Sequence, residues 1–157
     1  MNLAPERRGV EGPVGWAPMA TAASEPTDED YQRLLAFRTR LRQFLQWSEA
    51  EAEAAGITPA QHQLLLAVRG STAAGGPTIS EISEVLLLKH HSAVGLVDRA
   101  EHAGLVSRHP DATDGRVVRL RVTRKASAVL RKLSASHLDE LHRLAPALRA
   151  LDRAEPR

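Results

Sequence analysis

Apolar residues recur at the three- and four-residue spacing of amphipathic helices in four successive segments. The longest predicted helix spans residues 27–55, and its first turn carries three acidic side chains, which suit the positive end of a helix. Shorter helices are predicted over residues 58–70 and 78–86, and a fourth over about residues 90–103. From position 27 to 103 the chain is therefore predicted to be mostly helical.

Capping signals mark the starts of the second and third helices. Thr58 supplies an N-cap, Pro59 suits the first helical position, and Gln61 completes a capping box. Thr78 and Glu81 repeat the capping box at the third helix. These signals predict where the two helices begin.

A strand pattern replaces the helical one after residue 104. Residues 105–109 and 117–122 are strand-like, and the intervening residues 110–116 are dense in turn formers. The pattern predicts a β-hairpin with a projecting loop that carries Arg116.

Leucines then recur at nearly 3.5-residue spacing from Leu130 to Leu151, which predicts a terminal helix capped by Thr123. Pro146 is expected to break or bend this helix. The order of elements predicts a mostly α fold with a small β-hairpin wing, which is the order of a winged helix-turn-helix. In that fold the second helix of the motif enters the major groove of DNA.

The chain divides into a predicted tail and one domain. Residues 1–26 are rich in Pro and Gly without apolar periodicity, which predicts a disordered N-terminal tail. Residues 27–153 form the predicted domain, in which residues 57–122 make the DNA-binding lobe. The helices at 27–55 and 123–153 have more apolar surface than so small a lobe can cover, and we expect them to join two chains into a dimer.

Composition narrows the function classes. The 157 residues suit one domain, and the absence of cysteine excludes disulfides and thiol redox switches. No apolar run is long enough for a membrane span, so no membrane partner is expected and the cytoplasm is the expected location. The net charge of the chain is only +2, but residues 89–125 carry eight basic and four acidic side chains. This local excess favours a polyanionic partner.

Several short sequence motifs, taken together, match a known family. They are Gly56-Ile57-Thr58-Pro59-Ala60-Gln61, Leu96-Val97-Asp98-Arg99, Ala103-Gly104-Leu105-Val106, Asp114-Gly115-Arg116 and Leu120-Arg121-Val122-Thr123. The chain thereby resembles the MarR family of bacterial winged-helix regulators. The resemblance implies a homodimer that binds a pseudo-palindromic operator in double-stranded DNA, usually represses nearby genes, and is released by a small aromatic effector.

The expected DNA contacts lie on the third helix, the fourth helix and the hairpin. They are Thr78, Ser80, Lys89, His90, His91, Ser92, Gly95, Arg99, Asp114, Arg116 and Arg119. Gly95 stands where relatives often carry a long polar side chain, so more of the base contact falls to its neighbours at the start of the helix. The resemblance also implies that Asp114 holds Arg116 in shape for the minor groove. Arg119 either contacts phosphate or is merely solvated.

An effector pocket is expected where the end of the first helix meets the start of the second. Phe44, Trp47 and His62 fall there. The alternative is that Phe44 and Trp47 are ordinary core or dimer-interface residues.

Three other classes of function fit the sequence less well. A metal-responsive regulator is disfavoured because neither His90 with His91 nor His137 with His142 presents both rings to one metal. An enzyme is disfavoured because no nucleophile, base and oxyanion hole can be assembled from the sequence. No metal and no cofactor are therefore expected. A winged-helix module that binds another protein remains an alternative, and it differs from a DNA-binding protein in the salt dependence of a gel shift.

Overall fold

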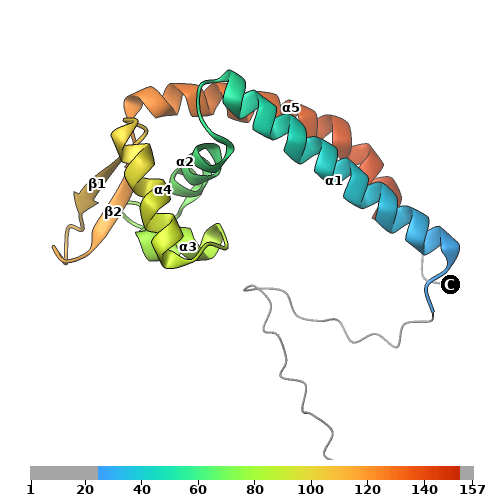
Figure 1. The fold of residues 1–157 in the computed structure, drawn as a ribbon, viewed down its shortest axis with the longest axis horizontal. Coiled ribbons are helices and arrows are strands. Elements are labelled where there is room, and N and C mark those ends of the chain that lie inside the picture. Colours follow the sequence, from blue (N-terminus) through green and yellow to red (C-terminus); the bar gives the residue numbers. More distant parts are fainter. Residues whose placement is uncertain (1–24, 153–157) are drawn as a thin grey trace, which may run out of the picture.

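Two long helices run side by side away from a small lobe (Figure 1). The structure, a computed structural model, describes residues 25–152 and the side chains of residues 25–146. Nearly all of the predicted tail, residues 1–26, lies outside the described residues. The elements are α1 (Asp28–Ala54), α2 (Pro59–Gly70), α3 (Ile79–Val85), α4 (His90–His102), β1 (Val106–Pro110), β2 (Val118–Val122) and α5 (Arg124–Asp152). This order confirms the predicted mostly α fold with a hairpin wing.

The predicted helix starts are confirmed in atomic detail. The Thr58 hydroxyl accepts the N–H of Gln61, whose side chain in turn accepts the N–H of Thr58. Thr78 and Glu81 form the same pair of bonds at α3. Each box satisfies two backbone donors that a helix leaves unpaired at its first turn, a contribution of about 1 kcal/mol per cap.

The hairpin attaches to the loop that follows α2. β1 and β2 are antiparallel with Arg108 opposite Leu120, and the N–H of Leu120 donates to the carbonyl of Pro77 at 2.8 Å. Gly76 has a φ of +103°, and a Cβ there would lie 2.1 Å from the Leu120 carbonyl oxygen. Gly76 is therefore fixed against β2, where only a residue without a side chain fits.

The core of the lobe lies where α2, α4 and β2 meet the first turns of α5. It includes Leu64, Leu65, Val97, Leu120 and Leu130, all at most 4% exposed. Each such side chain contributes about 1.5–3 kcal/mol when it is fully buried. This core fixes the orientation of α4 and of the wing.

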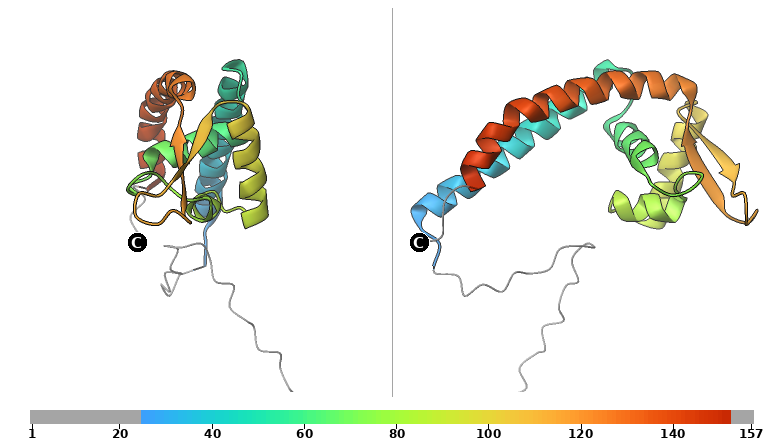
Figure 2. Two further views of the ribbon diagram at one scale, coloured as in Figure 1. Left: turned by 90° about the vertical axis from the view of Figure 1, so that its left-hand side faces the viewer. Right: turned by 180° about the vertical axis from the view of Figure 1, so that it is seen from behind.

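Helix α5 is long and leaves the lobe beside α1 (Figure 2). Pro146 lies inside it, and the helix continues to Asp152, so the expectation of a break there is wrong. A proline removes one backbone N–H from the helix, and the turns on either side keep theirs. The two long helices also pack against α2, and this junction connects them to the lobe.

Candidate nucleic-acid interface

Helix α4 has one buried face and one exposed face. Ala93, Leu96, Val97 and Ala100 are buried in the lobe, which leaves the polar positions of the helix outside. Lys89, His90, His91, Ser92 and Arg99 are all exposed, and Gly95 is half-buried. The structure thus brings the predicted residues of this helix together on one surface.

Gly95, the predicted contact position that has no side chain, is covered by the side chain of Arg99. A Cβ on Gly95 would lie 3.3 Å from Nη1 of Arg99, so the arginine side chain folds back along the helix over the glycine. Arg99 can therefore present its guanidinium where a longer residue at 95 would have stood.

The two predicted residues of α3 have different surroundings. Ser80 is exposed, whereas the Thr78 hydroxyl is used in the capping box and also donates to Glu81 Oε2 at 3.0 Å. The bond from the Thr78 N–H lowers the pKa of Glu81. Thr78 thus holds the start of α3 in place, and Ser80 is the free hydroxyl on this turn.

The tip of the wing presents Arg116 to solvent. Its backbone N–H donates to Oδ1 of Asp114 at 3.0 Å, and no ion pair joins its guanidinium to any described residue. Asp114 therefore shapes the turn through the backbone of Arg116 and not through a contact with its guanidinium. Asp111 organises the same loop by accepting bonds from Thr113 and Asp114, and these bonds hold the pKa of Asp111 well below its usual range.

The side chain of Arg119 lies between the loop of the wing and the start of α3, and it is only 21% exposed. Its Nε donates to Asp111 Oδ2 at 2.8 Å, and its Nη1 donates to the Gly76 carbonyl at 3.2 Å and lies 3.6 Å from Glu81 Oε2. Arg119 therefore connects the wing to the start of α3. Its geometry suits a positioning role, with its charge largely satisfied within the chain.

A second arginine, which the sequence analysis did not single out, connects the wing to α4. Arg108 of β1 pairs with Asp98 at 2.6 Å and with Glu101 of the same helix. The spacing of the two acids by three places them on one helix face, but only the path of β1 brings Arg108 to them. The ion pairs of Arg108 and Arg119 hold the hairpin in a defined orientation relative to α3 and α4.

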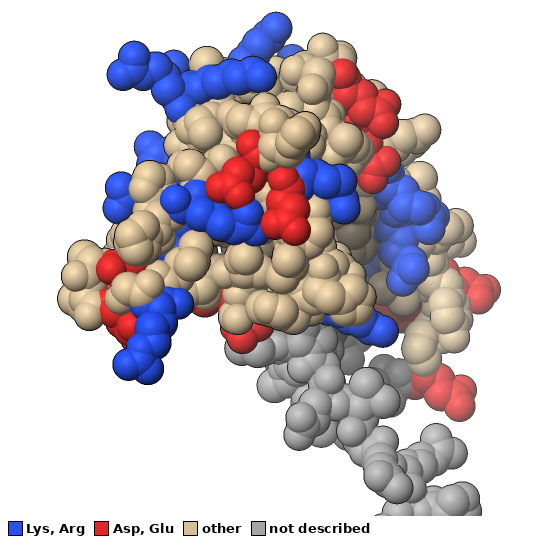
Figure 3. Space-filling model, turned by 60° about the vertical axis from the view of Figure 1, so that its left-hand side comes forward, with Lys and Arg blue, Asp and Glu red and all other residues tan. Residues whose placement is uncertain are grey.

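The basic side chains of the lobe do not form one continuous surface in the view of Figure 3. Lys and Arg side chains in Figure 3 form several separate groups, with Asp and Glu between some of them. This agrees with the acids being used in internal ion pairs with Arg108 and Arg119. The exposed cations at the start of α4 and at the wing tip are the ones available to a polyanion.

The predicted effector residues belong to an aromatic cluster at the α1–α2–α5 junction. Phe44 and Trp47 have ring centroids 5.9 Å apart, and the ring of His137 lies 4.7 Å from Trp47 and 4.8 Å from His62. His137 donates from Nδ1 to the Leu133 carbonyl, which leaves its Nε2 to accept from the Ser48 hydroxyl at 2.7 Å. The sequence did not indicate that His137 belongs to this cluster, because His137 lies far along the chain from the other rings.

His62 is the unusual member of this cluster. It is 1% exposed, and its Nε2 is buried with no hydrogen-bond partner. Burial lowers its pKa, and the neighbouring His137 lowers it further. His62 also lines a cavity of about 250 Å³ together with Ser48 and Glu49, whereas Phe44 and Trp47 do not line it.

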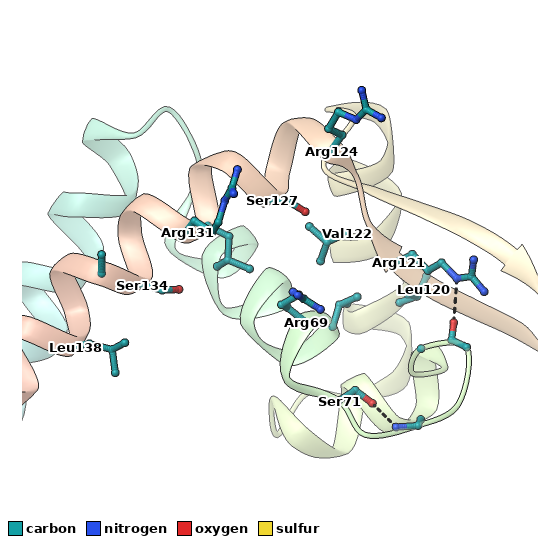
Figure 4. A pocket seen from close by; sticks show the side chains of 16 residues that line it. Arg69, Ser71, Leu120, Arg121, Val122, Arg124, Ser127, Arg131, Ser134 and Leu138 are labelled. Carbon is teal, nitrogen blue, oxygen red and sulfur yellow. Dashed lines mark hydrogen bonds between the residues drawn. The ribbon is translucent and has the colours of Figure 1, made fainter.

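A larger groove of about 980 Å³ lies between α2, β2 and α5. Figure 4 shows Arg69 on α2, Arg121 on β2, and Arg124 and Arg131 on α5 around it. Arg121 donates to the Gly75 carbonyl at 3.2 Å. No acidic residue lines this groove, so it is suited to an anionic group and not to a cation.

Within the residues that the structure describes, no group of three or more His, Cys, Asp or Glu side chains could hold a metal ion. No helix in this part of the chain is long and apolar enough to cross a membrane.

Comparisons with known proteins agree on one family. The MarR family model matches residues 55–117. A MarR family protein from Bacillus stearothermophilus has 27% identity and a TM-score of 0.64, with 78% of this chain and 83% of that chain covered. The MarR family transcription regulator SP03579 has 22% identity and a TM-score of 0.65, with coverages of 76% and 78%. A complex of Staphylococcus aureus MepR with DNA has 18% identity and a TM-score of 0.60, with coverages of 78% and 84%. No curated protein matches the sequence.

Proposed function

We propose that the chain is a MarR family transcription regulator, since the family model matches residues 55–117 and MarR family regulators share its fold, and that it represses transcription by binding a pseudo-palindromic operator as a homodimer. One observation carries the proposal. The start of α4, whose polar side chains are exposed, and the tip of the hairpin, whose loop carries the exposed Arg116, lie at the same end of the lobe, away from the α4–β1 turn and the start of α5 (Figure 1). DNA binding also requires access to the genome, so we propose a cytoplasmic location.

In this arrangement α4 lies in the major groove and the wing crosses the backbone beside it. Lys89, His90, His91 and Ser92 face base edges or phosphates, and Arg116 enters the neighbouring minor groove, which attracts arginine most where it is narrow. Arg119 positions the wing and is not itself proposed to contact the bases.

Dimerisation would use the two long helices. Tyr31, Leu34 and Leu35 of α1 are 57–62% exposed, and Leu138 of α5 is 56% exposed. Side chains of this kind on one pair of helices mark an interaction surface. A two-fold dimer built on them would place two copies of α4 about 34 Å apart, one turn of DNA.

The effector would act at the junction between these helices and the lobe. The unpartnered Nε2 of His62, which lines the cavity of about 250 Å³, suits the polar group of a small aromatic molecule, and the rings of Phe44 and Trp47 belong to the adjoining aromatic cluster. Binding there would change the angle between the long helices and the lobe, and with it the spacing of the two α4 helices.

Binding-site selection with the full-length chain tests the central proposal. We expect an inverted repeat, bound by two chains as measured by analytical ultracentrifugation, with affinity that falls steeply as salt rises. The double substitution Leu34→Glu with Leu35→Glu, which places two negative charges on this apolar surface, should give monomers that bind the same duplex much more weakly. Recovery of no sequence, together with no gel shift at low salt, would instead favour a protein-interaction module.

The effector is tested by adding sodium benzoate to the purified complex with its selected duplex. Benzoate should release the DNA from the wild type, and Trp47→Leu should abolish the release. Arg131→Gln, which changes the arginine-lined groove and not the aromatic cluster, should behave as wild type. If the groove variant alone loses the response, the effector binds there.

A further inference from the structure

The turn between α3 and α4 places a leucine where the backbone suits glycine. The N–H of Leu88 donates to the Ser83 carbonyl at 2.8 Å, and the N–H of Leu87 donates to the Glu84 carbonyl at 3.2 Å. This pair of bonds is a Schellman motif, whose left-handed position is usually glycine. Here that position is Leu87, with a φ of +53°. It is the only residue other than glycine with a positive φ among those described.

This leucine does not repay its conformation through packing in the chain. Leu87 is 73% exposed, and the neighbouring Leu88 and Val85 are 37% and 68% exposed. A Cβ in the left-handed region is strained, and an exposed leucine buries little apolar surface in return. Packing among the described residues therefore gives no stability reason for a leucine at 87, and an unexplained strained residue of this kind points to a function.

The position of the turn indicates what covers it. Leu88 directly precedes Lys89, the N-cap of α4, so both leucines adjoin the helix end that faces DNA in the proposed function. The turn lies at the same end of the lobe as the tip of the wing in Figures 1 and 2. The apolar group that DNA presents in its major groove is the 5-methyl group of thymine.

We propose that Leu87 and Leu88 contact thymine methyl groups in the major groove, beside the bases that face the start of α4. The proposal rests on the proposed DNA binding and adds a determinant of sequence preference to it. Gly95 itself has no side chain to offer a base, although Arg99 can present its guanidinium over that position, and histidine discriminates bases less sharply than the two-pronged contact of arginine. Apolar contacts from the adjacent turn would supply part of the missing discrimination.

The test replaces thymines of the selected operator by deoxyuridine, which lacks only the methyl group, one position of each half-site at a time. Removing one buried methyl should weaken binding about fourfold, and the symmetric pair about fifteenfold, from the transfer free energy of one such carbon. Leu88→Ala should weaken binding to the thymine operator. This variant should bind the deoxyuridine operator as tightly as it binds the thymine operator. Leu66→Ala removes a leucine of nearly equal exposure, 38%, on α2 and should keep the full methyl dependence.

Two variants at 87 separate the contact from folding. Leu87→Gly and Leu87→Asn suit the left-handed backbone and should melt at or above the temperature of the wild type, while both lose methyl dependence at one thymine. The proposal is overturned if every deoxyuridine operator is bound like its thymine counterpart, or if the leucine variants bind the thymine operator as tightly as wild type. If the wild type selects no duplex, the proposed function is overturned as well. If it selects a duplex but shows no methyl dependence, only the methyl contact is overturned.

Discussion

Replacement of Arg116 by glutamine tests the proposed wing contact directly. The guanidinium is exposed and forms no ion pair with any described residue, and the turn is shaped by the backbone bond to Asp114, which glutamine retains. The variant should therefore fold and dimerise normally while it loses one cation at each wing. DNA binding releases counterions in proportion to the phosphates neutralised, so the loss appears in the salt dependence of the affinity.

The size of the effect follows from the symmetry of the proposed complex. Two wings contribute two cations, so the slope of log K against log salt should become shallower by about 1.8. Between 50 and 200 mM salt, the affinity of the variant should then fall about twelvefold less than that of the wild type. Fluorescence anisotropy of a labelled operator, titrated at four salt concentrations, measures both slopes.

The matched control is Arg131→Gln, which removes an exposed arginine of α5 that is not part of the wing. Its slope should equal that of the wild type. An unchanged slope for Arg116→Gln, with affinity also unchanged, would refute the contact. An equal change in both variants would show that only the overall charge of the protein matters.

Three further predictions concern parts that position the interface. Arg119→Gln removes the contacts to Asp111 and Glu81. The variant should show faster amide hydrogen exchange in the wing and weaker operator binding, with a nearly unchanged salt slope. An unaltered exchange pattern would contradict this role. Leu120→Ala should lower the free energy of unfolding in urea by about 2–5 kcal/mol, because Leu120 is fully buried; a loss below 1 kcal/mol would mean that the hairpin is not part of the core. The pKa of His62 is lowered from 6.5 in the folded chain, so the unfolded chain binds the proton more readily and stability should fall as the pH drops below about 6.5. His62→Phe should reduce this dependence, and equal pH profiles for the two proteins would show that His62 does not cause it.

The local elements were predictable because their signals are short in range. The capping boxes at Thr58 and Thr78, the two faces of α4 and the hairpin with its Arg116 loop all depend on residues within a turn or two of each other. Backbone hydrogen bonds and helical periodicity act over the same distances. The expected break at Pro146 is not seen, because α5 continues through Pro146 to Asp152 and only the one backbone N–H of the proline is missing from the helix.

The roles of particular side chains were less predictable than the elements that carry them. Strand alternation places Arg119 and Arg121 on one face of β2, but it does not say what covers that face. Arg119 turns inward because the loop before Pro77 brings the Gly76 carbonyl to β2, and because Asp111 lies across the hairpin. The strained backbone of Leu87 was equally hidden, since leucine itself gives no sign of a positive φ.

The sequence alone determined the order of helices and strands, the exposed face of α4 and the resemblance to a family of regulators. Only the tertiary structure decided which cations are satisfied within the chain and which stay available, and that His137 meets Ser48 and His62 at the junction. Ser48 and His137 are separated by 89 positions. Contacts over such distances depend on how helices pack against one another, and no local pattern of residues encodes that packing.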